Sequence, residues 1–309
     1  MVSVFKATLS VDVHDVIGES PLWDAGGKRL IWVDNARGIV REGKQGTQGQ
    51  WHESRQWALE EPVGVAIPRA KGGLIVAGGT EIFTISEAGV RTSFACVAAD
   101  RSAVKIGDGK CDPLGRLWLG TQPHDFRRGQ CALYRIDLDG KVTMVLDGVG
   151  VSNGLDWSPD GKTFYYVDSL SRTVDAFDFQ IDAGAIVSRR SIVKLADGDG
   201  GFDGLAIDRE GCIWVAVFGK GQLRRYAPSG ELLARVEISA PGVTSCAFGG
   251  PLGADLFITS ASIVVPPAVA TLIGWSSESA ESSARAPGAG GLFVCRPGVS
   301  GNPATPYAG

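Results

Sequence analysis

The feature of this sequence that most constrains its fold is an apolar segment that follows a glycine-containing turn and recurs along the whole chain. The copies are KRLIWVD, GGLIVAG, GRLWLGT, KTFYYVD, GCIWVAV and ADLFITS. Their central residues are spaced about 43 to 49 residues apart, the repeat length of a four-stranded propeller blade; they are Trp32, Ile75, Trp118, Tyr165, Trp214 and Phe257. The sequence therefore predicts an all-β fold, a six-bladed β-propeller.

The segments between these copies also have the pattern of strands. Stretches such as ALYRIDLDGKV and QLRRYAPSGEL alternate apolar and polar residues and end in polar turns. We therefore expect one propeller domain over residues 1–309. The main irregularity is an inserted loop at about residues 262–290, rich in Ser, Ala, Pro and Gly. A loop of this length is either a lid over one face or a disordered insertion.

The charge and hydropathy of the chain exclude several classes of partner. The 30 Lys and Arg against 34 Asp and Glu give a net charge of -4, without a basic run that could neutralise phosphates, so no nucleic-acid partner is expected. The longest apolar stretch, residues 263–275, is shorter than the roughly 18 residues of a membrane span and contains two prolines, so no membrane is expected. The N-terminus lacks the pattern of a secretory signal and the six cysteines form no C-x-x-C pair, which predicts a cytoplasmic location.

The repeat also identifies residues that occupy equivalent positions in successive blades. Counting back eight residues from each turn glycine leads to Glu19, Gly64, Gly107, Asn153, Asp203 and Ser245, which we call the ring positions. Equivalent positions in a propeller lie at one height around its axis, so Glu19, Asn153 and Asp203 should converge. Two carboxylates and an amide gathered away from bulk water are costly to desolvate without a cation between them. The sequence thus predicts one divalent metal ion at this ring.

The type of ligand narrows the choice of metal without naming it. An all-oxygen set suits hard ions, of which Ca²⁺ is preferred and Mg²⁺ or Mn²⁺ are alternatives. Zn²⁺ and Fe²⁺ also accept carboxylate ligands and stay open.

Several segments together resemble the senescence marker protein, regucalcin and gluconolactonase family of six-bladed propellers. They are GESPLWD, DGKCDPLGRLWLGT, VSNGLDWSPDGKTFYYVDSLSRTVDAFDF, FDGLAIDREGCIWVA, TSCAFGG, AGGLF and PYAG. The resemblance covers nearly the whole chain. It implies a Glu, an Asn and an Asp as metal ligands, and these match Glu19, Asn153 and Asp203.

The resemblance also implies a hydrolase that opens a lactone. In such a reaction a divalent ion polarises the carbonyl and activates a water molecule, while a carboxylate accepts the proton of that water. We expect Asp203 to be this catalytic base, and a small lactone or ester to be the substrate. An arylesterase or organophosphate hydrolase that uses the same metal site, and a metal-binding propeller without catalysis, are the alternatives.

The sequence departs from the family where a substrate would be held. Sugar-lactone enzymes typically carry R-x-N-D-G-K, whereas this chain has Lys105 in place of the Arg and Gly107 in place of the Asn. The family's G-T-M is replaced by G-T-Q, ending in Gln122. The substrate-binding residues expected from these segments are Lys105, Gly107, Asp108, His124 and Asp125. We expect the missing side chain at Gly107 to leave a space that favours an apolar or branched substrate over gluconolactone.

One further motif points to a different chemistry. Residues 150–154 match G-x-S-x-G, the nucleophile elbow of serine hydrolases. An elbow needs a strand before it and a helix after it, whereas the residues that follow have the pattern of a turn and a strand. We therefore do not expect a serine hydrolase.

Overall fold

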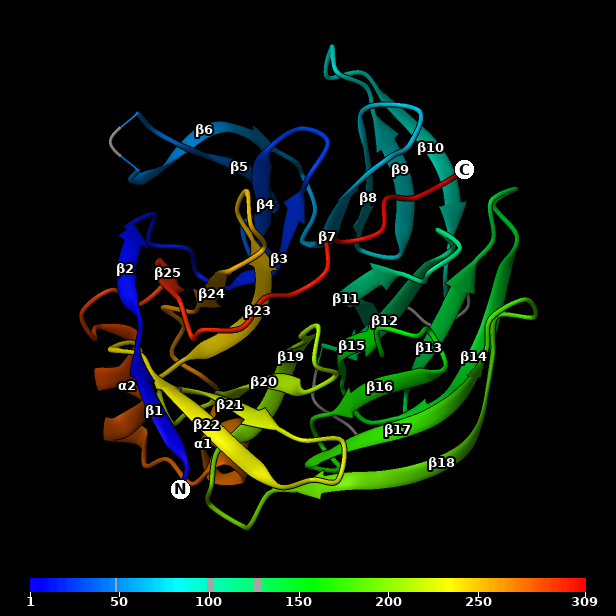
Figure 1. Ribbon diagram of the computed structural model, residues 1–309. Helices are drawn as coiled ribbons and strands as arrows, with labels where there is room; N and C mark the ends of the chain where they lie inside the picture. The colour runs from blue at the N-terminus through cyan, green and yellow to red at the C-terminus, as the bar shows by residue number, and fades with distance from the viewer. Residues whose placement is uncertain (48, 99–102, 125–128) are drawn as a thin grey trace.

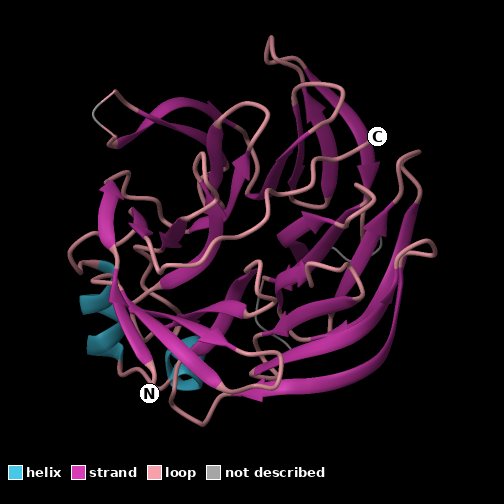
Figure 2. Cartoon of the chain, viewed as in Figure 1, coloured by secondary structure: helices cyan, strands magenta, loops and turns pink. Residues whose placement is uncertain are grey.

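The structure is a computed structural model, and it describes residues 1–47, 49–98, 103–124 and 129–309. These residues form six sheets, arranged as blades around a central axis (Figure 1). Strands account for nearly all of the regular structure, and the two helices gather at one side of the molecule (Figure 2). The prediction of a six-bladed β-propeller is confirmed.

Each blade is built from antiparallel strands, and in the first four blades the strands follow one another in sequence from the axis outward. The first blade contains β3 (Gly18–Asp24), β4 (Arg29–Asp34), β5 (Ile39–Gln45) and β6 (Trp51–Ala58). The second contains β7 (Val63–Pro68), β8 (Leu74–Gly78), β9 (Glu81–Ile85) and β10 (Arg91–Cys96). The third contains β11 (Val104–Cys111), β12 (Leu117–Pro123), β13 (Cys131–Ile136) and β14 (Val142–Val149). The fourth contains β15 (Ser152–Trp157), β16 (Thr163–Asp168), β17 (Thr173–Gln180) and β18 (Ala185–Lys194).

The last two blades are completed by the N-terminus. The fifth contains β19 (Gly201–Ile207), β20 (Ile213–Phe218), β21 (Gln222–Tyr226) and β22 (Leu232–Glu237), with β1 (Ser3–Lys6) added in parallel at its outer edge. The sixth contains β23 (Val243–Gly249), β24 (Asp255–Ser260), β25 (Leu292–Cys295) and β2 (Thr8–Val11). Because β2 is the outer strand of a blade whose other strands come from the C-terminal part of the chain, its pairing with β25 closes the ring.

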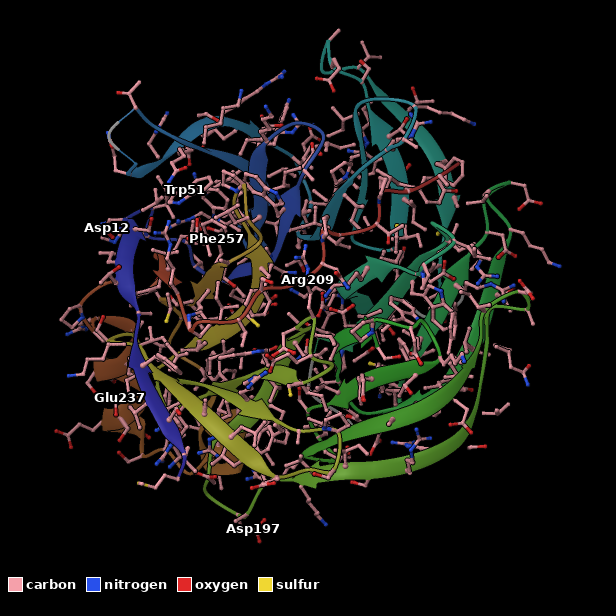
Figure 3. The ribbon with its side chains drawn as sticks, in the orientation of Figure 1. Asp12, Trp51, Asp197, Arg209, Glu237 and Phe257 are labelled. Carbon is pink, nitrogen blue, oxygen red and sulfur yellow. The ribbon has the colours of Figure 1, made fainter. Side chains whose placement is uncertain are left out.

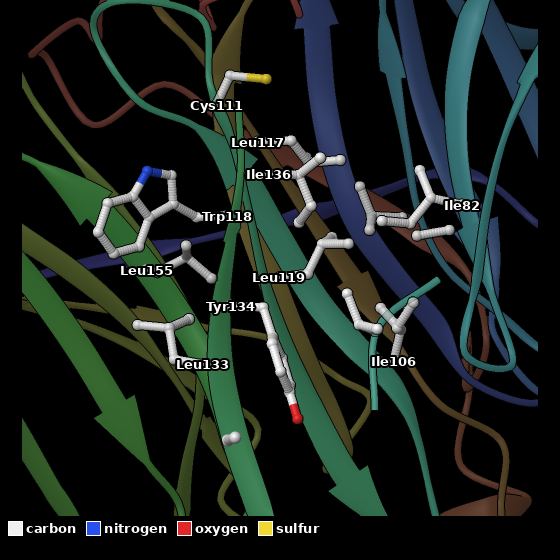
Figure 4. Packing of buried hydrophobic residues seen from close by; sticks show 14 of the residues in the cluster. Ile82, Ile106, Cys111, Leu117, Trp118, Leu119, Leu133, Tyr134, Ile136 and Leu155 are labelled. Carbon is white, nitrogen blue, oxygen red and sulfur yellow. The ribbon is translucent and has the colours of Figure 1, made fainter. Parts of the chain in front are cut away.

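The recurring apolar segments are the second strands of the blades, namely β4, β8, β12, β16, β20 and β24. Both faces of these strands are covered by neighbouring blades, which explains their continuous apolar sequence. Trp32, Trp118 and Trp214 are fully buried. Figure 4 shows one such interface, where side chains of the third blade pack against Ile82 of the second and Leu155 of the fourth. Trp51 and Phe257, which lie side by side in Figure 3, join the first blade to the sixth with ring centroids 4.8 Å apart.

The innermost strands of successive blades contact one another around the axis, and β23 returns to β3. In every blade the pairing between the innermost and the second strand shifts register at or beside the ring position. Such bulges bend a strand and re-aim the side chains beside them. The ring positions thus lie within the bulged innermost strands.

The segment at residues 262–290 contains two helices, α1 (Pro267–Ile273) and α2 (Ser277–Ala284), where the sequence had predicted only a loop. Pro267 starts α1, and Gly274 ends it in the left-handed conformation with φ of 78°. The Ser276 side chain caps α2 by accepting a hydrogen bond from Ser279 N. The helices are too short for their sequence pattern to reveal them, and they are stabilised by packing against Phe218 and Trp275. No helix among the described residues is long and apolar enough to cross a membrane.

Candidate metal and substrate site

Glu19, Asn153 and Asp203 line one pocket of about 340 Å³. Each of them lies near the start of its innermost strand, in β3, β15 and β19. The opposite ends of the innermost strands line a separate pocket. The structure therefore brings the three oxygen-bearing ring residues to the same end of the propeller axis.

Backbone bulges accompany the three polar ring residues that different blades contribute to this pocket. Register shifts occur between Glu19 and Leu22, between Asn153 and Leu155, and between Phe202 and Leu205. Without a shift, alternation along a strand would place neighbouring side chains strictly on opposite faces. Ser20, directly after Glu19, has a positive φ of 47°, which marks the distorted backbone at this point.

The carboxylates at the ring destabilise one another. Burial raises the pKa of Glu19 well above its usual range, and the charges of Asp203 and Asp108 raise it further. Burial likewise raises the pKa of Asp203, and the charge of Asp108 adds to this effect. Both residues line the pocket, and Asp203 is less deeply buried than Glu19. Ionisation of both carboxyl groups is therefore unfavourable unless a positive charge lies beside them.

No basic side chain among the described residues forms an ion pair with Glu19 or Asp203. The Lys105 ammonium donates instead to Asn35 Oδ1 at 2.7 Å. Glu19 Oε2 accepts a hydrogen bond from the backbone N–H of Ser20 at 2.7 Å, which leaves its other oxygen without a donor among the described residues. Divalent cations such as Ca²⁺ bind to oxygen donors, and a cation would also supply the positive charge that these carboxylates do not receive from an ion pair. The residues therefore fit such an ion.

Asn153 is held in one orientation by a chain of hydrogen bonds. Its Nδ2 donates to Ser169 Oγ at 2.8 Å, and Ser169 Oγ donates to the carbonyl oxygen of Phe202 at 2.6 Å. Because a carbonyl oxygen can only accept, Ser169 must donate to it and accept from Asn153. The carboxamide oxygen of Asn153 is thereby turned away from Ser169 and accepts a hydrogen bond from Gln122 Nε2 at 2.6 Å.

The predicted substrate-binding residues are distributed unevenly. Lys105 and His124 line the pocket. Burial lowers the pKa of the Lys105 ammonium, an effect that the Glu19 carboxylate opposes. Asp125 lies outside the described residues.

Asp108 does not line this pocket, so the expectation of a substrate contact needs correction. Its carboxylate accepts hydrogen bonds from Ser20 Oγ at 3.1 Å and from the Gly109 N–H at 2.7 Å. These contacts hold it in the interior beneath the ring, where its charge acts on Glu19 and Asp203. The geometry gives Asp108 an electrostatic effect on the ring and no contact with the pocket.

Gly107 also needs correction, because its missing side chain does not leave a space. A Cβ atom at this position would lie 2.2 Å from Cδ and 2.3 Å from Nε2 of Gln122. The Gln122 side chain therefore occupies the volume that the sequence had suggested was open.

Sequence reasoning missed Gln122 and the apolar wall of the pocket. Gln122 lines the pocket and donates to Asn153 Oδ1 at 2.6 Å; its signal was the unusual G-T-Q sequence. The wall comes from the irregular segment and consists of Ile263, Val265, Pro266, Val269, Leu272 and Ile273. Its signal was the apolar run at residues 263–275 within the predicted inserted loop.

A second acidic group, formed by Asp208, Glu210 and Cys212, differs in being neutralised. Asp208 Oδ2 accepts from Trp214 Nε1 at 2.9 Å and from Arg225 Nε at 2.8 Å. Arg225 also donates to Glu210 at 2.6 Å. This group is satisfied without a cation.

Ser152, the central residue of the G-x-S-x-G match, is fully buried. It is the first residue of strand β15, and its Oγ accepts a hydrogen bond from the Tyr166 hydroxyl at 2.6 Å. A strand at this position and a tyrosine partner do not make a nucleophile elbow.

Comparison with known proteins identifies the family to which the chain belongs. A family model described as "SMP-30/Gluconolactonase/LRE-like region" matches residues 17–262. Regucalcin from Danio rerio is 36% identical over 313 residues, covering 99% of this chain and 100% of that protein. Human regucalcin is 35% identical over 301 residues, covering 94% of this chain and 95% of that protein.

Solved structures show the same architecture. A calcium-binding protein, regucalcin, from Agrobacterium tumefaciens superposes with a TM-score of 0.86 at 25% identity, covering 99% of both chains. A luciferin-regenerating enzyme superposes with a TM-score of 0.84 at 27% identity, covering 98% of this chain and 99% of that one. The match to the family model and the nearly full-length similarity to regucalcins lead to one conclusion: the chain belongs to the SMP-30/gluconolactonase/LRE-like family.

Proposed function

We propose that this protein hydrolyses a small lactone with one divalent metal ion held by Glu19, Asn153 and Asp203. The observation that carries this proposal is that two carboxylates, neither of which forms an ion pair with another described residue, lie on one pocket that also has room for a small molecule. Membership of a gluconolactonase-like family supports the reaction class. Ca²⁺ is the proposed ion, because the donors are all oxygens and a structural relative is described as calcium-binding.

The proposed chemistry uses few protein groups. A bound divalent cation would polarise the lactone carbonyl and lower the pKa of a nearby water molecule. Asp203 is the proposed base, because it lines the pocket and is partly exposed as a residue, whereas Glu19 is buried. Asp203 accepts the proton of the attacking water, and Glu19 and the Asn153 carboxamide supply oxygen donors to the cation.

The pocket lining supports a substrate less polar than a sugar lactone. One wall consists of the apolar residues at positions 263–273, together with Phe202 and Phe218. Sugar hydroxyls placed against this wall would lose hydrogen bonds to water without replacement, which costs about 1–3 kcal/mol for each buried unpaired group. We propose a lactone that carries an alkyl or aryl substituent, bound with that substituent against the wall.

The test is a pH-indicator assay, because lactone hydrolysis releases a proton. Protein stripped with chelator is reloaded with Ca²⁺, Mg²⁺, Mn²⁺ or Zn²⁺ and presented with gluconolactone, alkyl γ- and δ-lactones, aryl esters and an organophosphate. We expect the fastest turnover on alkyl lactones, abolished by chelator and by Asp203→Ala. Asp197→Asn, a change in the exposed aspartate at the outer edge in Figure 3, is the matched control.

The other outcomes identify the alternatives. Preference for aryl or phosphate esters would indicate an arylesterase or organophosphate hydrolase. Metal binding with no turnover on any substrate would identify a propeller that binds metal without catalysis.

A further inference from the structure

Gln122 and Gly107 come from neighbouring strands of the third blade. The Gln122 side chain occupies the volume beside the ring that a side chain at position 107 would need. In the pairing of β11 with β12, Gln122 lies opposite Lys105, and the register shifts between Ile106 and Asp108. This bulge turns Gly107 toward Gln122, so that a Cβ atom there would meet Cδ, Cγ and Nε2 at 2.2 to 2.3 Å. Only one of the two positions can carry a side chain in this arrangement.

The backbone of Gly107 does not itself require glycine. Its φ lies outside the left-handed region that disfavours other residues. The atoms within 2.3 Å of the added Cβ all belong to the Gln122 side chain rather than to the backbone. Glycine at position 107 is therefore explained by the presence of Gln122.

The series of hydrogen bonds from Asn153 through Ser169 to Phe202 also determines the orientation of the Gln122 amide. Because Asn153 Nδ2 donates to Ser169, its Oδ1 faces Gln122, and Gln122 must donate to it through Nε2 at 2.6 Å. Gln122 Oε1 then makes no hydrogen bond to another described residue, while the side chain lines the pocket. The Gln122 side chain thus donates to the Asn153 oxygen through its N–H group, and its carbonyl oxygen remains an acceptor for a molecule in the pocket.

We propose that Gln122 is a positioning residue that supplies, from strand β12, the side-chain amide absent at Gly107. It fixes the Asn153 carboxamide by its N–H group and offers its carbonyl oxygen to a hydroxyl group or water molecule in the pocket. The proposal rests on the proposed function, since the oxygen it orients is a proposed metal ligand. Sugar-lactone enzymes of this family typically carry Asn at position 107; here the amide reaches the ring from the adjacent strand.

A double-mutant cycle between the two positions tests this exchange. The variants are Gln122→Ala, Gly107→Asn and the combination of both, with Gln122→Met to keep the side-chain volume while removing the amide. Gln180→Ala, an exposed glutamine at the end of β17, is the control. Ca²⁺ affinity is measured by calorimetric titration of chelator-treated protein, and kcat and KM are measured separately on the best lactone.

Gln122→Ala and Gln122→Met should each weaken Ca²⁺ binding by about tenfold or more, the usual effect of removing a partner of a metal ligand. Gly107→Asn alone should lose a similar amount, because the new side chain displaces the Gln122 amide from Asn153. The combination should recover to within roughly threefold of wild type, since the added amide then has room. Gln180→Ala should change nothing.

Equal affinity and turnover in wild type and Gln122→Met, or simple addition of the two single losses in the combination, would overturn the positioning role. If wild type neither binds Ca²⁺ nor hydrolyses any lactone, the proposed function fails instead. Thermal unfolding of each variant in chelator separates both results from a folding defect.

Discussion

A guanidinium nitrogen of Arg172 donates a 2.7 Å hydrogen bond to the carbonyl oxygen of Leu272, which joins the fourth blade to the last turn of α1. Trp275 Nε1 makes a second connection, to the carbonyl oxygen of Gly219 in the fifth blade, at 2.9 Å. Through these bonds the segment at residues 262–290 is attached to two blades next to the ring. Its apolar residues can therefore act as a fixed wall of the pocket.

The wall predicts how substrate preference changes on mutation. Val269→Ser combined with Leu272→Ser should lower kcat/KM for alkyl lactones by about tenfold, the effect of losing one to two kcal/mol of apolar contact, with little change for gluconolactone. Val264→Ser is the control, because Val264 is 53% exposed and does not line the pocket. Metal content should stay at the wild-type level, and equal losses on polar and apolar lactones would exclude the wall from substrate selection.

Each proposed metal ligand predicts a linked loss of metal and activity. Glu19→Gln and Asn153→Ala each remove or weaken one oxygen donor, so Ca²⁺ affinity and kcat/KM should fall together. Elemental analysis alongside turnover measures both quantities.

The Asp203→Asn variant distinguishes a role of Asp203 as metal ligand from a role as catalytic base. The amide can still coordinate a cation but cannot accept a proton, so the rate should fall by about 10²-fold or more beyond the loss in metal occupancy. A rate loss that full metal loading restores would leave Asp203 as a ligand only.

The ring carboxylates predict how the stability of the metal-free protein depends on pH. The pKa values of Glu19 and Asp203 are raised by burial and then by neighbouring carboxylates, so the folded metal-free protein holds protons that the unfolded chain releases. Its stability should therefore decrease as the pH rises from about 4, the usual carboxylate pKa, through the raised values. Ca²⁺ should remove most of this decrease.

Asp203→Asn should make the metal-free protein more stable at neutral pH, because it removes one of the repelling charges, while Asp197→Asn should not. Thermal unfolding in chelator at about pH 5 and about pH 8 measures the difference. A metal-free wild type that becomes more stable over this range would contradict the proposed repulsion.

The Gln122 side chain, which fills the volume beside Gly107, determines which substitutions should favour gluconolactone as a substrate. Lys105→Arg with Gly107→Asn should gain little, because the new asparagine meets the Gln122 side chain. Adding Gln122→Ala should shift the ratio of kcat/KM values toward gluconolactone by about tenfold, the contribution of one to two hydrogen bonds. The test compares kcat/KM of the double and triple variants on gluconolactone and on an alkyl lactone. Equal ratios in the two variants would show that Gln122 does not obstruct position 107.

The N-terminal strands make unequal contributions to stability. Deleting residues 1–12 removes β2, which pairs with β25 and closes the ring, so the melting temperature should fall sharply. Deleting residues 1–6 removes β1, a largely exposed fifth strand at the edge of the fifth blade, and should cost far less. Thermal unfolding of the two truncated proteins tests whether β2 closes the ring of blades. Equal melting temperatures would contradict this role.

The sequence by itself determined the blade count and the candidate ligands. Both depend on a repeat whose copies are each encoded locally, as strands of period two bounded by glycine turns. Equivalent positions in equivalent blades must lie at one height, so Glu19, Asn153 and Asp203 could be grouped before any coordinates were known. The family resemblance of GESPLWD, VSNGLDWS and FDGLAID selected the same residues.

Only the tertiary structure decided which volumes around the ring are filled. A glycine in the sequence suggests a space, but packing in protein interiors leaves few voids, and a neighbour on another strand takes the place of the missing side chain. Gln122 does this at Gly107, and Ile106 does it at Gly64. Such contacts depend on bulge geometry and side-chain direction, which no local pattern encodes. The same is true of α1, because its apolar residues acquire a role only through Phe218 and Arg172, contributed by blades distant in the sequence.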